Sequence, residues 1–188
     1  IGKDGFTRIL TTGATQFNTI FIRCLNDACS AFHSNEVTDG TLANMNRETT
    51  MILDPNDFAS ILINGGDGDV TYYLLYAHCS DLDCAGKDTP LAGTTITSSS
   101  GNFGTLHMVW NPLTNSPIMA YQWNSPSTIV RVCTDYKTCA VSTATSVDTA
   151  VANPVYGIQI DPNTNLPVVF LRNDAALQAG VILCSDEY

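Results

Sequence analysis

The feature that most constrains the fold is a short apolar stretch that ends in a cysteine and occurs four times along the chain. Each copy is typical of a β-strand that runs into a polar turn, and its lead cysteine is Cys24, Cys79, Cys133 or Cys184. These cysteines lie 55, 54 and 51 residues apart. Self-similarity at a fixed period is the signature of a repeat architecture. We therefore expect a single repeat domain over residues 1–188, with approximate repeats at 1–48 (partial), 49–101, 102–150 and 151–188 (partial).

Three of the repeats also carry a predicted hairpin before the cysteine-ended strand. An apolar strand ends at Asp or Asn followed by Pro, a few turn-forming residues follow, and a second apolar strand begins; the turns start at Asp54, Asn111 and Asp161. An Asp or Asn side chain bonds back to the turn backbone, and Pro presets φ for the next position. A weaker fourth strand, such as 94–97 or 140–143, completes a unit of four antiparallel strands.

A four-stranded antiparallel unit of about 50 residues is typical of a β-propeller blade. The second strands at 60–63 and 167–171 are continuously apolar, which suits sheets packed on both faces. The chain resembles the broad class of secreted β-propeller repeats, with a kelch-like repeat length and a cysteine-clamped turn after strand three. That resemblance implies an all-β, propeller-like fold of tandem four-stranded antiparallel blades. A β-sandwich is the alternative, but it does not explain cysteines in phase with the repeat.

Both terminal repeats are expected to be incomplete. The sequence begins at strand two of one blade and ends at strand three of another, which predicts fourteen strands grouped three, four, four and three. The chain is then either an excerpt of a longer propeller or a subunit whose open blades take a strand from a partner. Strand exchange head to tail between copies of the chain would grow a filament.

The remaining three cysteines each follow a lead cysteine closely. The resulting pairs are Cys24 with Cys29, Cys79 with Cys84, and Cys133 with Cys139. A disulfide in so small a ring contributes about 2 kcal/mol by loop-closure entropy. Zinc is the alternative, but a tetrahedral site needs two pairs to converge, whereas pairs that recur once per blade should lie far apart. Cys184 has no such follower, so we expect it to remain a thiol or to pair with a cysteine outside this chain.

The cysteine content and the net charge limit the compartments and the classes of partner that this chain could have. Disulfides imply an oxidising environment, so the expected location is extracellular or the cell surface. Eight Lys and Arg against eighteen Asp and Glu give a net charge of −10, which repels phosphate backbones and argues against nucleic-acid binding. No apolar run approaches the roughly 18 residues of a membrane-spanning helix.

The candidate catalytic and metal-binding residues lack some of the groups that usually accompany such sites. His107 could be a general base near the turn residues Asp54, Asn111 and Asp161, but no Ser or Cys nucleophile accompanies it, so packing and turn roles are favoured. The glycine-rich stretch 65–69 could hold Ca²⁺ through two carboxylates, but it lacks a closing Glu and lies where a tight turn is expected. Its two carboxylates are Asp67 and Asp69.

Three aromatic residues, Trp110, Tyr121 and Trp123, could stack on sugars, although aromatics on apolar strands more often fill interfaces between blades. The chain lacks the paired glycines of kelch blades and the Ser-x-Asp box of sialidase-like blades, so no functional residues of those families transfer to it. We expect a non-enzymatic extracellular structural or interaction module with no cofactor or metal, such as a subunit of a surface appendage or of a filament completed by strand exchange. Its partners would be other protein chains, including copies of itself, or glycans. The alternative is a carbohydrate-binding or glycoside-hydrolase-type propeller.

Overall fold

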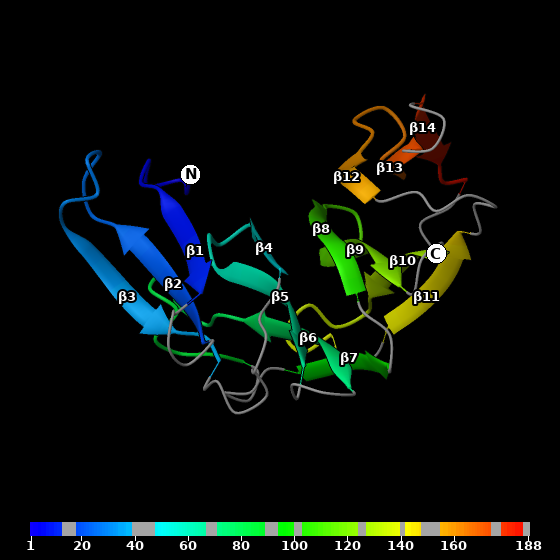
Figure 1. The fold of residues 1–188 in the computed structure, drawn as a ribbon. Helices are drawn as coiled ribbons and strands as arrows, with labels where there is room; N and C mark the ends of the chain where they lie inside the picture. Colours follow the sequence, from blue (N-terminus) through cyan, green and yellow to red (C-terminus); the bar gives the residue numbers. More distant parts are fainter. Residues whose placement is uncertain are drawn as a thin grey trace.

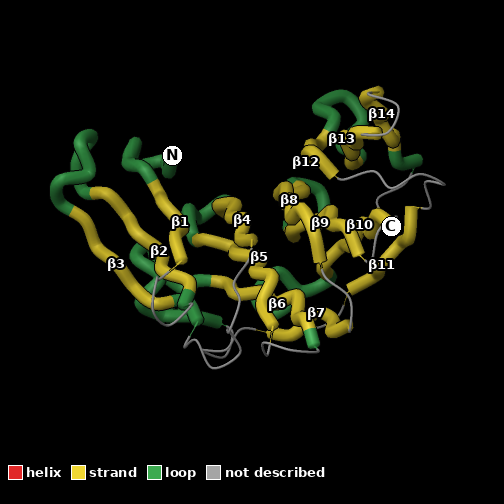
Figure 2. The backbone as a smooth tube through the Cα atoms, viewed as in Figure 1, coloured by secondary structure: helices red, strands yellow, loops and turns green. Residues whose placement is uncertain are grey.

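The computed structural model describes residues 1–12, 18–38, 48–66, 71–88, 94–99, 103–123, 127–139, 142–147, 155–173 and 178–185. Within these ranges the chain forms fourteen strands in four antiparallel sheets and contains no helix (Figures 1 and 2). The predicted all-β class is thus confirmed, as is the grouping of three, four, four and three strands. The described strands close neither a barrel nor a ring.

Each sheet is a meander whose strands pair in chain order. The first sheet contains β1 (Arg8–Thr12), β2 (Thr19–Cys24) and β3 (Phe32–Glu36). The second contains β4 (Glu48–Leu53), β5 (Ala59–Gly66), β6 (Tyr72–His78) and β7 (Thr94–Ser99). The third contains β8 (Phe103–Asn111), β9 (Ser116–Trp123), β10 (Ser127–Cys133) and β11 (Ser142–Val147). The fourth contains β12 (Val155–Ile160), β13 (Pro167–Asn173) and β14 (Gln178–Leu183).

The weak fourth strands lie close to where the sequence predicts them. The strand expected at 94–97 is the start of β7. Of the strand expected at 140–143, residues 142 and 143 are described, and they form the start of β11, where Ser142 pairs with Cys133 at the end of β10. Residues 140 and 141 lie outside the described part of the chain.

Each sheet has a turn that directly precedes β1, β5, β9 or β13. One turn residue in each has a left-handed φ: Gly5 (83°), Asp57 (67°), Asn115 (51°) and Asn165 (57°). Glycine adopts this conformation without a steric cost, and Asp and Asn tolerate it better than other residues. This residue therefore serves as a common origin for comparing positions among the four sheets.

Apolar cores lie between successive sheets. Phe21 of the first sheet packs with Ile61 of the second. Leu62, on the opposite face of the second sheet, packs with Met119 of the third. Ala120, on the opposite face of the third sheet, packs with Val169 of the fourth. The two middle sheets are therefore covered on both faces, which accounts for the continuously apolar run Ile61, Leu62 and Ile63 in β5.

The sheets follow one another along an arc (Figure 1). The strands β4, β8 and β12, each the first of its sheet, are neighbours along the inside of this arc, and β1 lies beside β4. Among the described residues the first sheet has no counterpart of β4, and the fourth has no counterpart of β7. The first and fourth sheets stand at the two ends of the arc, so each has one face that no other described sheet covers.

Candidate functional site at the disulfide-clamped corners

A disulfide closes the turn after the third strand of the repeat in three sheets. The structure joins Cys24 to Cys29, Cys79 to Cys84 and Cys133 to Cys139, the pairs that the spacing predicts. The Cα atoms of the pairs are 4.8, 4.8 and 4.9 Å apart. In every pair the second cysteine has a left-handed φ of 50° to 57°. An ordinary side chain rarely adopts this conformation, so the bridge holds the same uncommon turn in three places.

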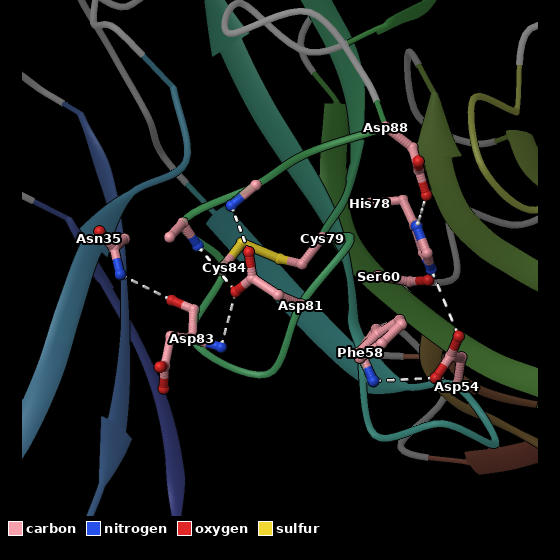
Figure 3. The surroundings of a disulfide bond; sticks show 12 residues. Asn35, Asp54, Phe58, Ser60, His78, Cys79, Asp81, Asp83, Cys84 and Asp88 are labelled. Atoms are coloured by element: carbon pink, nitrogen blue, oxygen red, sulfur yellow. Dashed lines mark hydrogen bonds and ion pairs between the residues drawn. A yellow bond between two sulfur atoms is a disulfide. The ribbon is translucent and has the colours of Figure 1, made fainter.

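The same turn is closed by an Asn or Asp side chain that the sequence patterns left without a role. Asp81 Oδ1 accepts the backbone N–H groups of Asp83 and Ala85 at 2.9 and 3.0 Å (Figure 3). Asn26 and Asp135 accept backbone N–H groups in the other two turns, at 3.0 Å each. The hydrogen bond from Thr138 is the main cause that lowers the pKa of Asp135. The sequence contains a pattern that could have predicted this role, since an Asn or Asp stands two residues after each of these lead cysteines.

The clamped turn of the second sheet also binds the first sheet. Asn35 Nδ2 donates to the Asp83 carbonyl at 2.9 Å (Figure 3). Arg23 Nη1 also donates to Asp83 Oδ1 at 3.0 Å. Burial opposes ionisation of Asp83, but the hydrogen bonds from Arg23 and His33 prevail and lower its pKa. Arg23 thus connects two sheets by a partly buried ion pair.

Arg23 is itself held by the turn at the start of the chain. Its Nη2 lies 2.9 Å from Asp4 Oδ2, and Asp4 also pairs with the buried Arg8 at 3.0 Å. The hydrogen bond from Arg8 is the largest cause that lowers the pKa of Asp4. The network fixes the N-terminal hairpin against the same corner.

A buried polar cluster lies beside this corner, at the boundary between the second and third sheets. His78 is 1% exposed; its Nδ1 is 2.8 Å from Asp88 Oδ2, and its Nε2 is 3.5 Å from Asp54 Oδ2 (Figure 3). The Tyr136 ring, from the clamped turn of the third sheet, packs edge-on against His78 at 5.3 Å. Ser60, paired with His78 across β5 and β6, is fully buried.

These residue types could support acid–base chemistry, but the residues at the centre of the cluster are buried. Asp54 is 4% exposed, and the hydroxyl of Tyr76 fills the space between Ser60 Oγ (2.9 Å) and the Tyr136 carbonyl (2.5 Å). Burial raises the pKa of Tyr76, so this hydroxyl remains protonated. The cluster therefore connects two sheets; its His78 and Asp54 are buried, and the Asp88 side chain is 23% exposed. No sequence spacing predicted it, because strand pairing brings its members together.

The four residues proposed as a catalytic group, His107, Asp54, Asn111 and Asp161, each make different contacts. Asp54 Oδ1 accepts the N–H groups of Asn56 and Phe58 in its own turn. The Asn111 and Asp161 side chains likewise accept N–H groups two residues on, at 2.9 Å each. His107 Nε2 contacts the Val155 carbonyl at 3.2 Å, between the third and fourth sheets. None of the four lines either pocket described below.

The aromatic candidates differ in their access to solvent. Trp110 lines a pocket of about 460 Å³ together with Met51 and Met108. Tyr121 is fully buried between the second and third sheets, and Arg131 Nε donates to its hydroxyl at 3.2 Å. The expectation that Tyr121 could stack on a sugar is therefore wrong, because the neighbouring sheet covers its ring.

The other candidates are placed only in part. Trp123 ends β9, but its side chain is outside the described part of the structure, as are the whole residues Asp67 and Asp69. Cys184 follows β14 directly and forms no disulfide with any cysteine of the chain. Among the described residues, no group of three or more His, Cys, Asp or Glu side chains is arranged to hold a metal ion. The described part also contains no helix of the length and apolar character that crossing a membrane requires.

No protein-family model matches this chain, and comparison with curated proteins finds no significantly similar sequence.

Proposed function

We propose that this chain is a non-enzymatic structural or interaction module of the extracellular or cell-surface environment, built from propeller-like blades. The observation that carries the proposal is the disulfide-clamped turn after the third strand in three successive sheets. The side chains best suited to chemistry, including His78 and Asp54, are used in turns and buried contacts between sheets. The function would then be to present a rigid surface.

The arrangement of the sheets supports the comparison with propeller blades. Each sheet is a meander, each packs face to face on the next in chain order, and the first strands lie together on the inside of the arc. Blades of a propeller share these features.

Sulfur chemistry supports the proposed location. Three small intrachain disulfides form and persist in oxidising environments, whereas cytosolic thiols are kept reduced. Outside the cell, bridges of this kind would protect the turns against local opening.

Strand exchange could extend the module into a filament. Neither the outer edge of β1 nor that of β14 is paired among the described residues. An open edge offers unpaired N–H and C=O groups to an incoming strand, and donation head to tail between chains gives an open, growing assembly.

Carbohydrate binding is the second candidate, and the half-buried Trp110 in its 460 Å³ pocket favours it over hydrolysis. To test the proposal, we would titrate the oxidised protein with soluble oligosaccharides while recording tryptophan fluorescence, and assay aryl glycosides for turnover. The module proposal predicts no saturable quenching and no turnover. Saturable quenching that disappears in Trp110→Ala, or turnover that disappears in Asp54→Asn, would overturn it in favour of the carbohydrate function.

A further inference from the structure

The fourth sheet has an apolar face that no other part of the described chain covers. Phe170, Val181 and Leu183 are 36%, 56% and 74% exposed, and Tyr156 is 54% exposed. Phe170 pairs with Val181 across β13 and β14, so both lie on the same face. A pocket of about 490 Å³ on this face is lined by Tyr156, Phe170, Arg172 and Val181. Contiguous exposed apolar surface of this kind marks an interaction site.

Comparison among the sheets shows what such a face packs against. We call the side of a sheet that meets the next sheet in chain order its forward face, and the opposite side its backward face. Five residues after the left-handed turn residue stand Leu10, Leu62, Ala120 and Phe170. The first three pack on the following sheet, and Leu62 and Ala120 are fully buried there. Phe170 occupies the same position with no following sheet.

The third strand of the repeat gives the same result independently. Three residues before the lead cysteine stand Phe21, Tyr76, Val130 and Val181. Their exposed fractions are 1%, 0%, 7% and 56%. The first three pack in the three cores between sheets. The exposed face of the fourth sheet is therefore a forward face without its partner.

The first sheet carries the complementary free surface. Four residues after the left-handed turn residue stand Ile9, Ile61, Met119 and Val169. The last three are fully buried against the preceding sheet, whereas Ile9 is 39% exposed. Ile9 pairs with Ile22 across β1 and β2, which places both on the backward face of the first sheet. This chain thus carries both halves of a fourth sheet-to-sheet interface, at opposite ends of the arc (Figure 1).

We infer that the forward face of the fourth sheet binds the backward face of the first sheet in a second copy of this chain. The inference rests on the proposed function and specifies its partner. The contact repeats the packing already used at three interfaces within the chain, and it is heterologous, so it produces either a closed ring or a filament. Because each copy carries a net charge of −10, repulsion opposes association, and salt should strengthen it by screening.

The first test measures self-association by analytical ultracentrifugation across protein concentration and salt. We expect the association of the wild-type chain to strengthen with salt. The variant Val181→Asp should raise the dissociation constant at least tenfold. The control is Leu113→Asp in the hairpin turn of the third sheet, where Leu113 is 61% exposed, and it should leave association unchanged. A wild-type chain that stays monomeric at every concentration, or equal association of the Val181→Asp variant, would overturn the inference. The face would then belong to a further sheet of a longer chain or to another partner.

The second test traps the contact without relying on a disruptive variant. In a Cys184→Ser background, we would mix chains carrying Ile9→Cys with chains carrying Phe170→Cys under mild oxidation. A linked heterodimer should form well beyond the linkage in either variant alone. Equal linkage in the unmixed variants, or none on mixing, would contradict the predicted pairing. Neither outcome affects the glycan test, so failure of this contact and failure of the proposed function are distinguishable.

Discussion

At the scale of single residues, one carboxylate or amide organises each clamped turn. Asp81 accepts three backbone N–H groups, those of Asp83, Ala85 and Gly86. These donors have no strand partner, because the chain reverses direction here. The side chain replaces the hydrogen bonds that a sheet would supply, as Asn and Asp commonly do in turns.

Removing that acceptor should destabilise the protein measurably. We expect Asp81→Ala to lower the free energy of unfolding by about 1–3 kcal/mol, since three N–H groups lose their acceptor. Asp81→Asn should recover much of the loss, because Asn26 performs this role in the first sheet. Urea denaturation measures both effects.

The exposed Asp27 of the first turn provides the matched control. Asp27→Ala should change stability by no more than about 0.5 kcal/mol, as is usual for exposed surface positions. Equal losses in Asp81→Ala and Asp27→Ala would contradict the proposed role of Asp81.

At the scale of elements, the repeated unit is a third strand, a clamped turn and a weaker outer strand. Cys79 and Cys84 are both fully buried, and each packs in the core between the first and second sheets. Their bridge therefore constrains the chain in the unfolded state and also fills space in the folded one.

The double variant Cys79→Ser/Cys84→Ser should lose at least about 2 kcal/mol of stability, the chain-entropy contribution of so small a ring. The midpoint of thermal unfolding, followed by circular dichroism, should fall accordingly. Cys184→Ser is the control, because Cys184 takes part in no disulfide of this chain. A midpoint equal to that of the control would show that the clamp is dispensable.

At the scale of the whole molecule, the sheets are held together by apolar cores and by a few polar contacts between sheets. The Arg23–Asp83 pair joins the first and second sheets. Because the pKa of Asp83 is lowered in the folded protein, the contribution of this pair to stability depends on pH. The pKa of Asp83 is lower in the folded protein than its usual value of about 3.9 in an unfolded chain. Its contribution to stability is therefore present above that pH and is lost as the pH falls through the folded value.

Asp83→Asn should thus reduce stability near pH 7 by about 1 kcal/mol, as expected for a partly exposed ion pair. It should also make stability less sensitive to pH between about 5 and 2, since the variant has one fewer carboxyl with a lowered pKa. Urea denaturation across this pH range measures both effects. If Asp83→Asn lost as much stability as the wild type on acidification, Asp83 would not be a source of the pH dependence. Asp27→Asn tests whether any exposed carboxylate has the same effect.

The sequence alone determined the repeat, the strand grouping and the three cysteine pairs, because each depends on local spacing along the chain. A hairpin turn or a six-residue clamp contains all of its own determinants. The ends of the outer strands were less accurate, since pairing with β6 and β10 extends β7 to Ser99 and β11 to Val147.

Only the tertiary structure decided which residues meet across sheets. It buried Tyr121, a candidate for sugar stacking, beneath the second sheet, and it placed His78 between Asp54 and Asp88. It also left Val181 exposed at a position that is buried in the other three sheets. The physical reason is that burial depends on the neighbouring sheet: the same strand pattern is core when another sheet covers it and interaction surface when none does.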